Sequence, residues 1–149
     1  MTMNWPVKGE DTWRTFKKER NEILDFVTDN AIPGVVVLSG DRHEVGVQRL
    51  RGGTIEFSTS PVQQFYSPID TYRDVEDDKG IFAWRKGNIK WAKVEVNDSP
   101  NPNMTYSLYV NDISGASIFC SMQLMLLDHP IYKLTINPAQ EILAEWKRF

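Results

Sequence analysis

A carboxylate and an imidazole lie two positions apart at the end of a short apolar run. Residues 35–38 are apolar, a Ser-Gly pair follows them, and Asp41 and His43 come next. An apolar run closed by Ser-Gly predicts a buried strand that ends in a tight turn. In sheets of alternating strands and helices, ligands gather beyond the carboxyl ends of strands. A carboxylate and an imidazole together suit zinc, iron or manganese better than calcium alone, so Asp41 and His43 are candidate metal ligands.

Two donors do not complete a metal site, because three or four protein donors are usual. The alternative interpretation is a polar turn in which Asp41 caps nearby backbone amides. His129, which lies between Asp128 and Pro130, is the other histidine and is predicted to be structural. Cys120 is predicted to be a buried thiol, and a single cysteine excludes an internal disulfide and a Cys-based zinc site. The spacing alone leaves the metal and the capping interpretations open.

Composition and charge are those of an ordinary globular domain. The chain has 149 residues, of which 41% are hydrophobic and 25% charged, which is enough for one domain with a real core. Its formal net charge of −3 argues against a general attraction to nucleic acid or to anionic membranes. The first residues form no export signal, and the most apolar window, residues 116–127, is too short to span a bilayer. We therefore expect no nucleic-acid and no membrane partner, and the compartment stays open.

The segment before the strand predicts an amphipathic helix from residue 11 or 12 to residue 29, with Asp11 as its N-cap. Charged residues within positions 17–22 supply most of the solvated side. Asn30 and Pro33 prevent the helix from continuing. The predicted apolar face consists of Trp13, Phe16, Ile23, Leu24 and Val27, with Phe26 at its margin. A helix, a short turn and a buried strand make half of a βαβ unit.

Later segments predict strands followed by a terminal helix. Apolar and alternating runs predict strands at residues 44–50, 54–58, 81–84, 89–96, 104–110 and 131–136. A turn is predicted at Gly52-Gly53, a hairpin-like loop at residues 97–103 and a solvated acidic loop around residues 74–78. A last helix is predicted from Pro138, with Asn137 as its N-cap. Its apolar side would be Ile142, Leu143, Trp146 and Phe149. The order of elements predicts an α/β (α+β) fold.

One basic and aromatic patch is visible in the sequence. It comprises Arg85, Lys86, Lys90 and Lys93 beside Trp84 and Trp91. Proteins that bind single-stranded nucleic acid use such mixtures. An outward-facing strand whose cations lie over the tryptophans is the favoured interpretation.

Two motifs carry a resemblance to a known family. Residues 11–20 and 32–44, the latter with Leu-Ser-Gly-Asp-Arg-His-Glu, closely resemble the C-terminal part of the PhoD-like alkaline phosphatases, which belong to the calcineurin-like metallophosphoesterase superfamily. Residues 57–66 and 91–96 look like the fungal-type branch of that family. The resemblance covers about residues 1–112, which we expect to be the C-terminal part of the phosphatase domain. Residues 113–149 would form an unassigned strand and helix extension.

The resemblance implies an incomplete metallophosphoesterase β-sandwich flanked by helices, with a multinuclear metal site at the strand ends. A metal-bound hydroxide would attack the phosphorus of a phosphate ester substrate. Asp41 and His43 match the family's last metal-binding block, in which related enzymes have a His-x-His pair, so that Asp41 takes the place of the first histidine. Arg42 would lie near the phosphate of the substrate. The ions implied are divalent or trivalent (iron, zinc, manganese or calcium).

The sequence departs from the family upstream of this block. The family's other metal ligands come from loops that precede the last helix of the second half, and they do not occur in these 149 residues. The chain therefore looks like a fragment or a shortened product, with a second chain as the candidate that completes the fold. Two functions stay open. One is metal-dependent phosphoester hydrolysis, weak or lost in this piece. The other is a non-catalytic α/β binding module that uses Trp84, Trp91 and exposed sheet edges.

Overall fold

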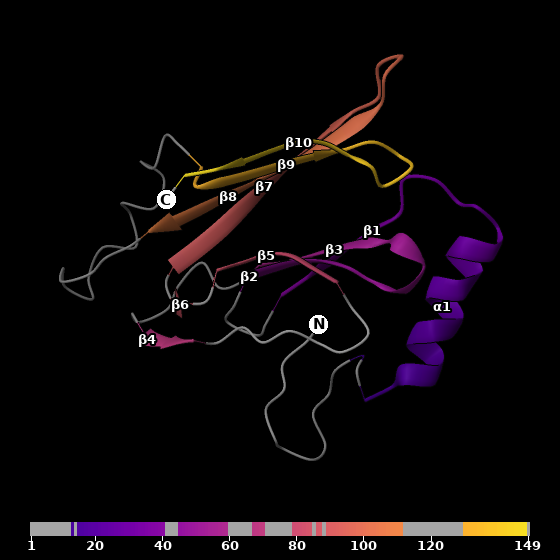
Figure 1. Ribbon diagram of the computed structural model, residues 1–149, viewed down its shortest axis with the longest axis horizontal. Coiled ribbons are helices and arrows are strands. Elements are labelled where there is room, and N and C mark those ends of the chain that lie inside the picture. The colour runs from indigo at the N-terminus through magenta and orange to yellow at the C-terminus, as the bar shows by residue number, and fades with distance from the viewer. Residues whose placement is uncertain are drawn as a thin grey trace.

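The computed structural model describes residues 13, 15–40, 45–59, 67–70, 79–84, 86–87, 89–111 and 130–148. These residues form two four-stranded sheets that lie face to face, with one helix beside them (Figure 1). The elements are α1 (Lys17–Asp29), β1 (Val36–Ser39), β2 (Val45–Arg49), the 3₁₀ turn η1 (Arg51–Gly53), β3 (Ile55–Thr59), β4 (Ser67–Asp70), β5 (Lys79–Trp84), β6 (Lys86–Gly87), β7 (Ile89–Asn97), β8 (Asn103–Asn111), β9 (Tyr132–Ile136) and β10 (Ile142–Lys147). The expected α+β fold, a partial β-sandwich, is confirmed.

The first sheet has the order β1-β3-β2-β5, and the second has the order β10-β9-β8-β7. A short β4–β6 pair lies apart from both. β1 pairs with β3 in parallel, and the other pairs are antiparallel. None of the helices in the described part of the chain combines the length and the apolar character needed to span a bilayer.

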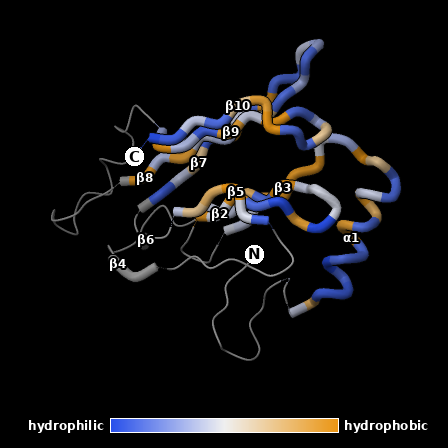
Figure 2. Tube along the Cα trace, viewed as in Figure 1, coloured by the Kyte–Doolittle hydropathy of each residue, from blue (hydrophilic) through white to orange (hydrophobic). Residues whose placement is uncertain are grey.

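The hydrophobic core lies between the two sheets, because alternate side chains of each strand point to the same face. Figure 2 shows hydrophobic positions along the strands of both sheets and a largely hydrophilic α1. Aromatic rings connect the layers: Phe57 stacks on Tyr106 with ring centroids 4.5 Å apart, and Phe82 stacks on Tyr132 at 3.9 Å. The buried core residues are Val45, Val47, Ile55, Phe57, Phe82, Met104, Tyr106, Leu108, Val110, Tyr132, Leu134 and Ile136.

Helix α1 starts later than predicted and buries less of its apolar face. It begins at Lys17, with Phe16 at the N-cap, so the prediction of Asp11 as the cap is wrong. Leu24 is 1% exposed, whereas Phe26 is 61% exposed. Arg20, which lies in the segment predicted to be solvated, is buried. Among the described elements α1 packs on η1, and this contact involves Leu24, Asp25 and Thr28.

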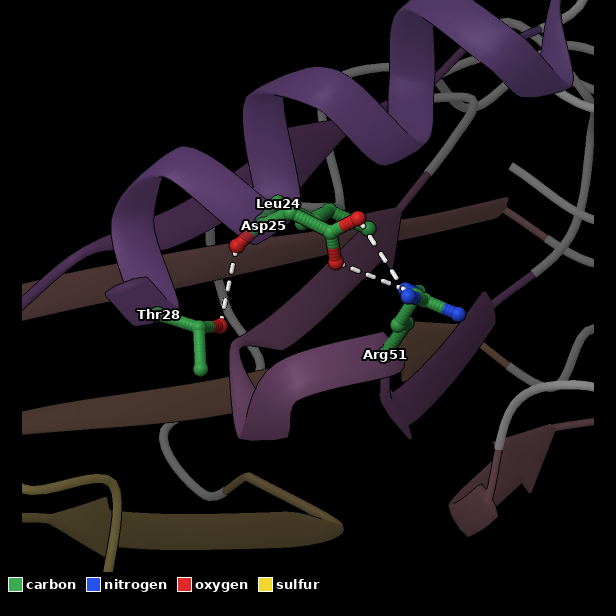
Figure 3. Close-up of polar contacts among 4 residues, drawn as sticks. All are labelled: Leu24, Asp25, Thr28 and Arg51. Atoms are coloured by element: carbon green, nitrogen blue, oxygen red, sulfur yellow. Dashed lines mark hydrogen bonds and ion pairs between the residues drawn. The ribbon is translucent and has the colours of Figure 1, made fainter. Parts of the chain in front are cut away.

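The contact between α1 and η1 combines a polar clamp with close packing (Figure 3). Arg51 in η1 donates from Nε to Asp25 Oδ1 at 2.7 Å and from Nη2 to Asp25 Oδ2 at 3.3 Å. Thr28 donates its hydroxyl hydrogen to the carbonyl oxygen of Leu24 at 2.9 Å, which fixes its side chain against the helix. These contacts attach the second half of the helix to η1.

The predicted terminal helix is wrong, because residues 142–147 form strand β10 beside β9. The Asn137-Pro138 signal opens a hairpin turn instead. The backbone of Asn137 donates to the carbonyl oxygen of Glu141 at 3.1 Å, and Gln140 has a φ of 63°, which a helix cannot contain. The edge of β9 then offers β10 a partner, and tertiary pairing overrides the local helix signal. The other predicted strands and the Gly52-Gly53 turn are confirmed.

Two burial predictions also fail. The run before Asp41 was predicted to be a buried strand, but Leu38 in β1 is 61% exposed, and β1 is an edge strand among the described strands of the first sheet. Lys90 was expected on an outward face beside Trp91, and it is completely buried. Trp91 itself stacks on Tyr109, with ring centroids 4.0 Å apart. Lys90 therefore does not belong to an outward-facing patch, whereas Lys93 of the same strand is exposed.

Candidate functional site

The predicted site residues, Asp41, Arg42 and His43, lie outside the described residues. The same holds for Cys120, His129, Arg85 and the acidic segment 74–78. The structure does describe the strands on either side of the Asp-Arg-His motif, since β1 ends at residue 39 and β2 begins at residue 45. The site can therefore be built from the strand ends that lead into and out of the motif.

These strand ends meet at one edge of the first sheet. Ser39, the last residue of β1, is in register with Ser58 of β3. Val45, the first residue of β2, is in register with Thr59, the last residue of β3. Since β3 lies between β1 and β2, the motif's two flanking strands meet at the carboxyl end of β3. Carboxyl ends of strands are where α/β proteins collect ligands.

Below this edge lies a buried carboxylate that sequence reasoning did not single out. Glu56 of β3 is 2% exposed. Because side chains alternate along a strand, Glu56 lies on the opposite face of the sheet from Ile55 and Phe57, which belong to the core. Its Oε1 accepts a hydrogen bond from Ser39 Oγ at 2.6 Å, and its Oε2 accepts one from Gln48 Nε2 at 2.5 Å. Glu56 thus connects β3 to both of its neighbouring strands.

The environment keeps Glu56 ionised. Burial by itself raises the pKa of a carboxyl group, whereas the hydrogen bonds from Ser39 and Gln48 lower it, and the pKa of Glu56 lies below its ordinary value. A buried carboxylate is tolerated only where its oxygens are satisfied in this way. In the sequence, the alternation Ile-Glu-Phe in β3 indicates that Glu56 faces away from the core. Such alternation ordinarily predicts that the outer face is solvated, not buried. Burial of that outer face comes from packing that the local pattern does not encode.

A second polar contact lies at the same edge. The hydroxyl groups of Thr59 in the first sheet and Tyr106 in the second sheet are hydrogen-bonded to each other. Burial raises the pKa of the Tyr106 phenol well above its ordinary value, and the bond to Thr59 offsets only part of this. The phenol therefore keeps its proton at neutral pH. Tyr106 therefore connects the two sheets beside the candidate site. A phenol that keeps its proton does not act as a general base there.

The donors fit a metal ion in kind but not in number. Asp41 and His43 offer one carboxylate and one imidazole, which suit an ion of borderline hardness. Both Glu56 oxygens already accept hydrogen bonds from protein groups. Within the described segments, no three side chains of His, Cys, Asp or Glu converge as a metal site requires. The remaining donors would have to come from outside the described segments.

Comparison with known proteins identifies the family. The family model of the PhoD-like phosphatases matches residues 3–106, which is more than half of the chain and includes the Asp-Arg-His motif and the strands on either side of it. Searches of curated proteins and of solved structures gave no match. The extent of the family match is sufficient by itself: this chain belongs to the PhoD-like phosphatase family.

Proposed function

We propose that this chain takes part in the metal-dependent hydrolysis of phosphoric esters. Membership of the PhoD-like phosphatase family supports phosphoester hydrolysis at the level of the family, and PhoD-like phosphatases are generally metal-dependent. The observation that carries the proposal is that the strands flanking the Asp-Arg-His motif in the sequence, β1 and β2, meet at the carboxyl end of β3, within the matched segment. In this proposal Asp41 and His43 are metal ligands and Arg42 binds substrate.

Each motif residue has a role that suits its chemistry. The Asp41 carboxylate and one imidazole nitrogen of His43 would hold the ion, which is iron, zinc, manganese or calcium in this proposal. The Arg42 guanidinium would pair with two phosphate oxygens at once, as its planar fork allows. When bound, the metal supplies Lewis-acid polarisation of the phosphate and a water of lowered pKa. Motifs at residues 57–66 and 91–96 support assignment to the fungal-type branch of the PhoD-like family, within the calcineurin-like metallophosphoesterase superfamily.

A second chain is part of the proposal, because two ligands hold an ion weakly. β1 is an edge strand in the described part of the first sheet, and its Leu38 is 61% exposed. Open strand edges favour pairing with another chain. A partner that covers β1 would lie next to the Asp-Arg-His motif and could supply further donors. Nucleic acid and membranes are not part of the proposal.

The alternative is a non-catalytic binding module, and exposed apolar side chains favour it. Phe16 and Phe26 of the α1 region and Leu38 of β1 are all more than half exposed. Trp84 and Trp91, the residues first considered for docking, are only half-exposed, and Trp91 stacks on Tyr109. A binding module would therefore use the α1 side of the molecule and the edge of β1.

Elemental analysis and turnover of p-nitrophenyl phosphate, measured on the same samples, test the proposal. The wild type is compared with Asp41→Ala/His43→Ala and with Asp98→Ala, which removes an exposed carboxylate in the turn between β7 and β8. We expect stoichiometric iron, zinc, manganese or calcium in the wild type and in Asp98→Ala, and its loss in the double variant. Turnover that is lost together with the metal would assign the chemistry to this motif. A folded wild type without metal or turnover would leave the binding module.

A further inference from the structure

We infer that Glu56 is a positioning residue for the site: through Ser39 it holds the carboxyl end of β1, from which Asp41 and His43 follow. This inference rests on the proposed function, because it concerns the same motif. It assigns a role to a buried group that neither the family match nor the motif itself identifies.

The first step is the placement of the two hydrogen bonds. Glu56 is paired in register with Gln48 of β2 on one side, and Ser39 is the last residue of β1 on the other. Each carboxylate oxygen serves one neighbouring strand, at 2.6 Å for Ser39 and 2.5 Å for Gln48. One buried group therefore fixes the strand that leads into the motif relative to the strand that leads out of it.

The second step is the proximity of the contact to the motif. Ser39 is two residues before Asp41, so the bond to Glu56 restrains the last residue of β1. A ligand's orientation depends on the groups that hold its backbone and side chain, and loss of such support commonly weakens metal binding by about 10- to 100-fold. The bond is short and involves an ionised acceptor, which makes it stronger than one between neutral groups.

The third step is the chemistry of the buried group. A buried carboxylate is tolerated only where its oxygens accept hydrogen bonds, and those of Glu56 accept them from both neighbouring strands. An apolar side chain at this position would not provide these directed bonds to the strands on either side of the motif.

The experiment uses hydroxyl deletions at two matched places. Ser39→Ala removes the donor to Glu56. Thr105→Val is the control, because it removes a hydroxyl from another half-buried contact, the 3.0 Å hydrogen bond between Thr105 and Thr135 in the second sheet. A second pair tests the carboxylate directly. Glu56→Gln removes the negative charge and one of the two acceptor oxygens, and adding Gln48→Glu supplies an acceptor opposite the new NH2 group.

Two measurements decide the outcome: Mn²⁺ affinity by titration calorimetry and amide hydrogen exchange over residues 39–45. For Ser39→Ala and Glu56→Gln we expect about tenfold weaker Mn²⁺ binding and faster exchange in this segment. Thr105→Val is expected to match the wild type, and Glu56→Gln/Gln48→Glu is expected to return affinity to within about threefold of it.

The possible failures are distinguishable. If the wild type binds Mn²⁺ and Ser39→Ala and Glu56→Gln bind it equally well, the inference is overturned and the proposed function stands. If the wild type binds no Mn²⁺, the proposed function fails. The positioning role of Glu56 is then tested by hydrogen exchange alone, and an unchanged exchange rate over residues 39–45 in Ser39→Ala overturns it. Recovery of affinity in the double variant would exclude general destabilisation as the cause.

Discussion

Alanine in place of Gly52 is expected to cause a large loss of stability by pushing α1 away from η1. Gly52 has a φ of 77°, in the left-handed region that favours glycine. A Cβ atom there would lie 2.0 Å from Thr28 Oγ1 and 3.3 Å from Thr28 Cβ. The hydroxyl cannot easily move away, because Thr28 is stiff at χ1 and is hydrogen-bonded to Leu24 (Figure 3).

Two costs add at this position. The left-handed backbone costs alanine about 1–2 kcal/mol relative to glycine. Forcing a methyl group into a closely packed contact typically costs about 1–3 kcal/mol more. We therefore expect Gly52→Ala to lower the free energy of unfolding by about 2–5 kcal/mol, a large part of the total of about 5–15 kcal/mol for a domain.

A double-mutant cycle separates the two costs. Thr28→Ala removes the clashing hydroxyl, so adding it to Gly52→Ala is expected to recover about 1–2 kcal/mol in urea unfolding followed by tryptophan fluorescence. Gly53→Ala is the matched control. It shares a positive φ, of 97°, but its nearest neighbour is Arg49 Nη1 at 4.0 Å. Its effect should therefore be additive with that of Thr28→Ala. Additivity in the Gly52 cycle, or equal coupling in both cycles, would refute the packing argument.

Further predictions concern the core and its C-terminal part. Tyr132→Phe loses the 3.1 Å hydrogen bond to Glu145 and should cost about 0.5–1.5 kcal/mol, whereas Tyr132→Ala also loses the ring stacked on Phe82 and should cost about 3–5 kcal/mol in urea unfolding. Similar losses for the two variants would contradict the stacking geometry. Deleting residues 112–149 removes β9 and β10 and should abolish cooperative thermal unfolding, measured by circular dichroism. A sharp transition in the shortened chain would show that the first part folds alone.

Local patterns predicted most of the strands because strand alternation survives tertiary packing. The runs at residues 89–96 and 104–110, separated by a proline-containing loop, form the long β7–β8 hairpin. The helix was predicted in the right place, but its start and its buried face were not. α1 has an apolar face wider than the single contact with η1 covers, and sequence periodicity cannot say which part of a face finds a partner.

The prediction of a terminal helix failed for a different reason. Asn137 and Pro138 are typical of a helix start and also of a turn, and the choice was made by the free edge of β9, a feature distant in sequence. The candidate site shows the same limit. The Asp-Arg-His motif could be found by spacing, and the strands before and after it were predicted correctly. Glu56 could not be found, because its burial depends on what covers the outer face of the first sheet.

The contacts of the β9–β10 turn explain why the part of the chain beyond the family match belongs to the same folding unit. The carbonyl oxygen of Pro138 accepts a hydrogen bond from the Gly34 amide at 2.7 Å, just before β1. Gln140 accepts one from Arg49 through its backbone carbonyl at 2.9 Å and one from the Ile55 amide through its side chain at 3.1 Å. The turn thus binds the entry of β1, the end of β2 and the start of β3. Since β1 leads into the Asp-Arg-His motif, residues outside the family match help to fix the strand that positions the candidate ligands.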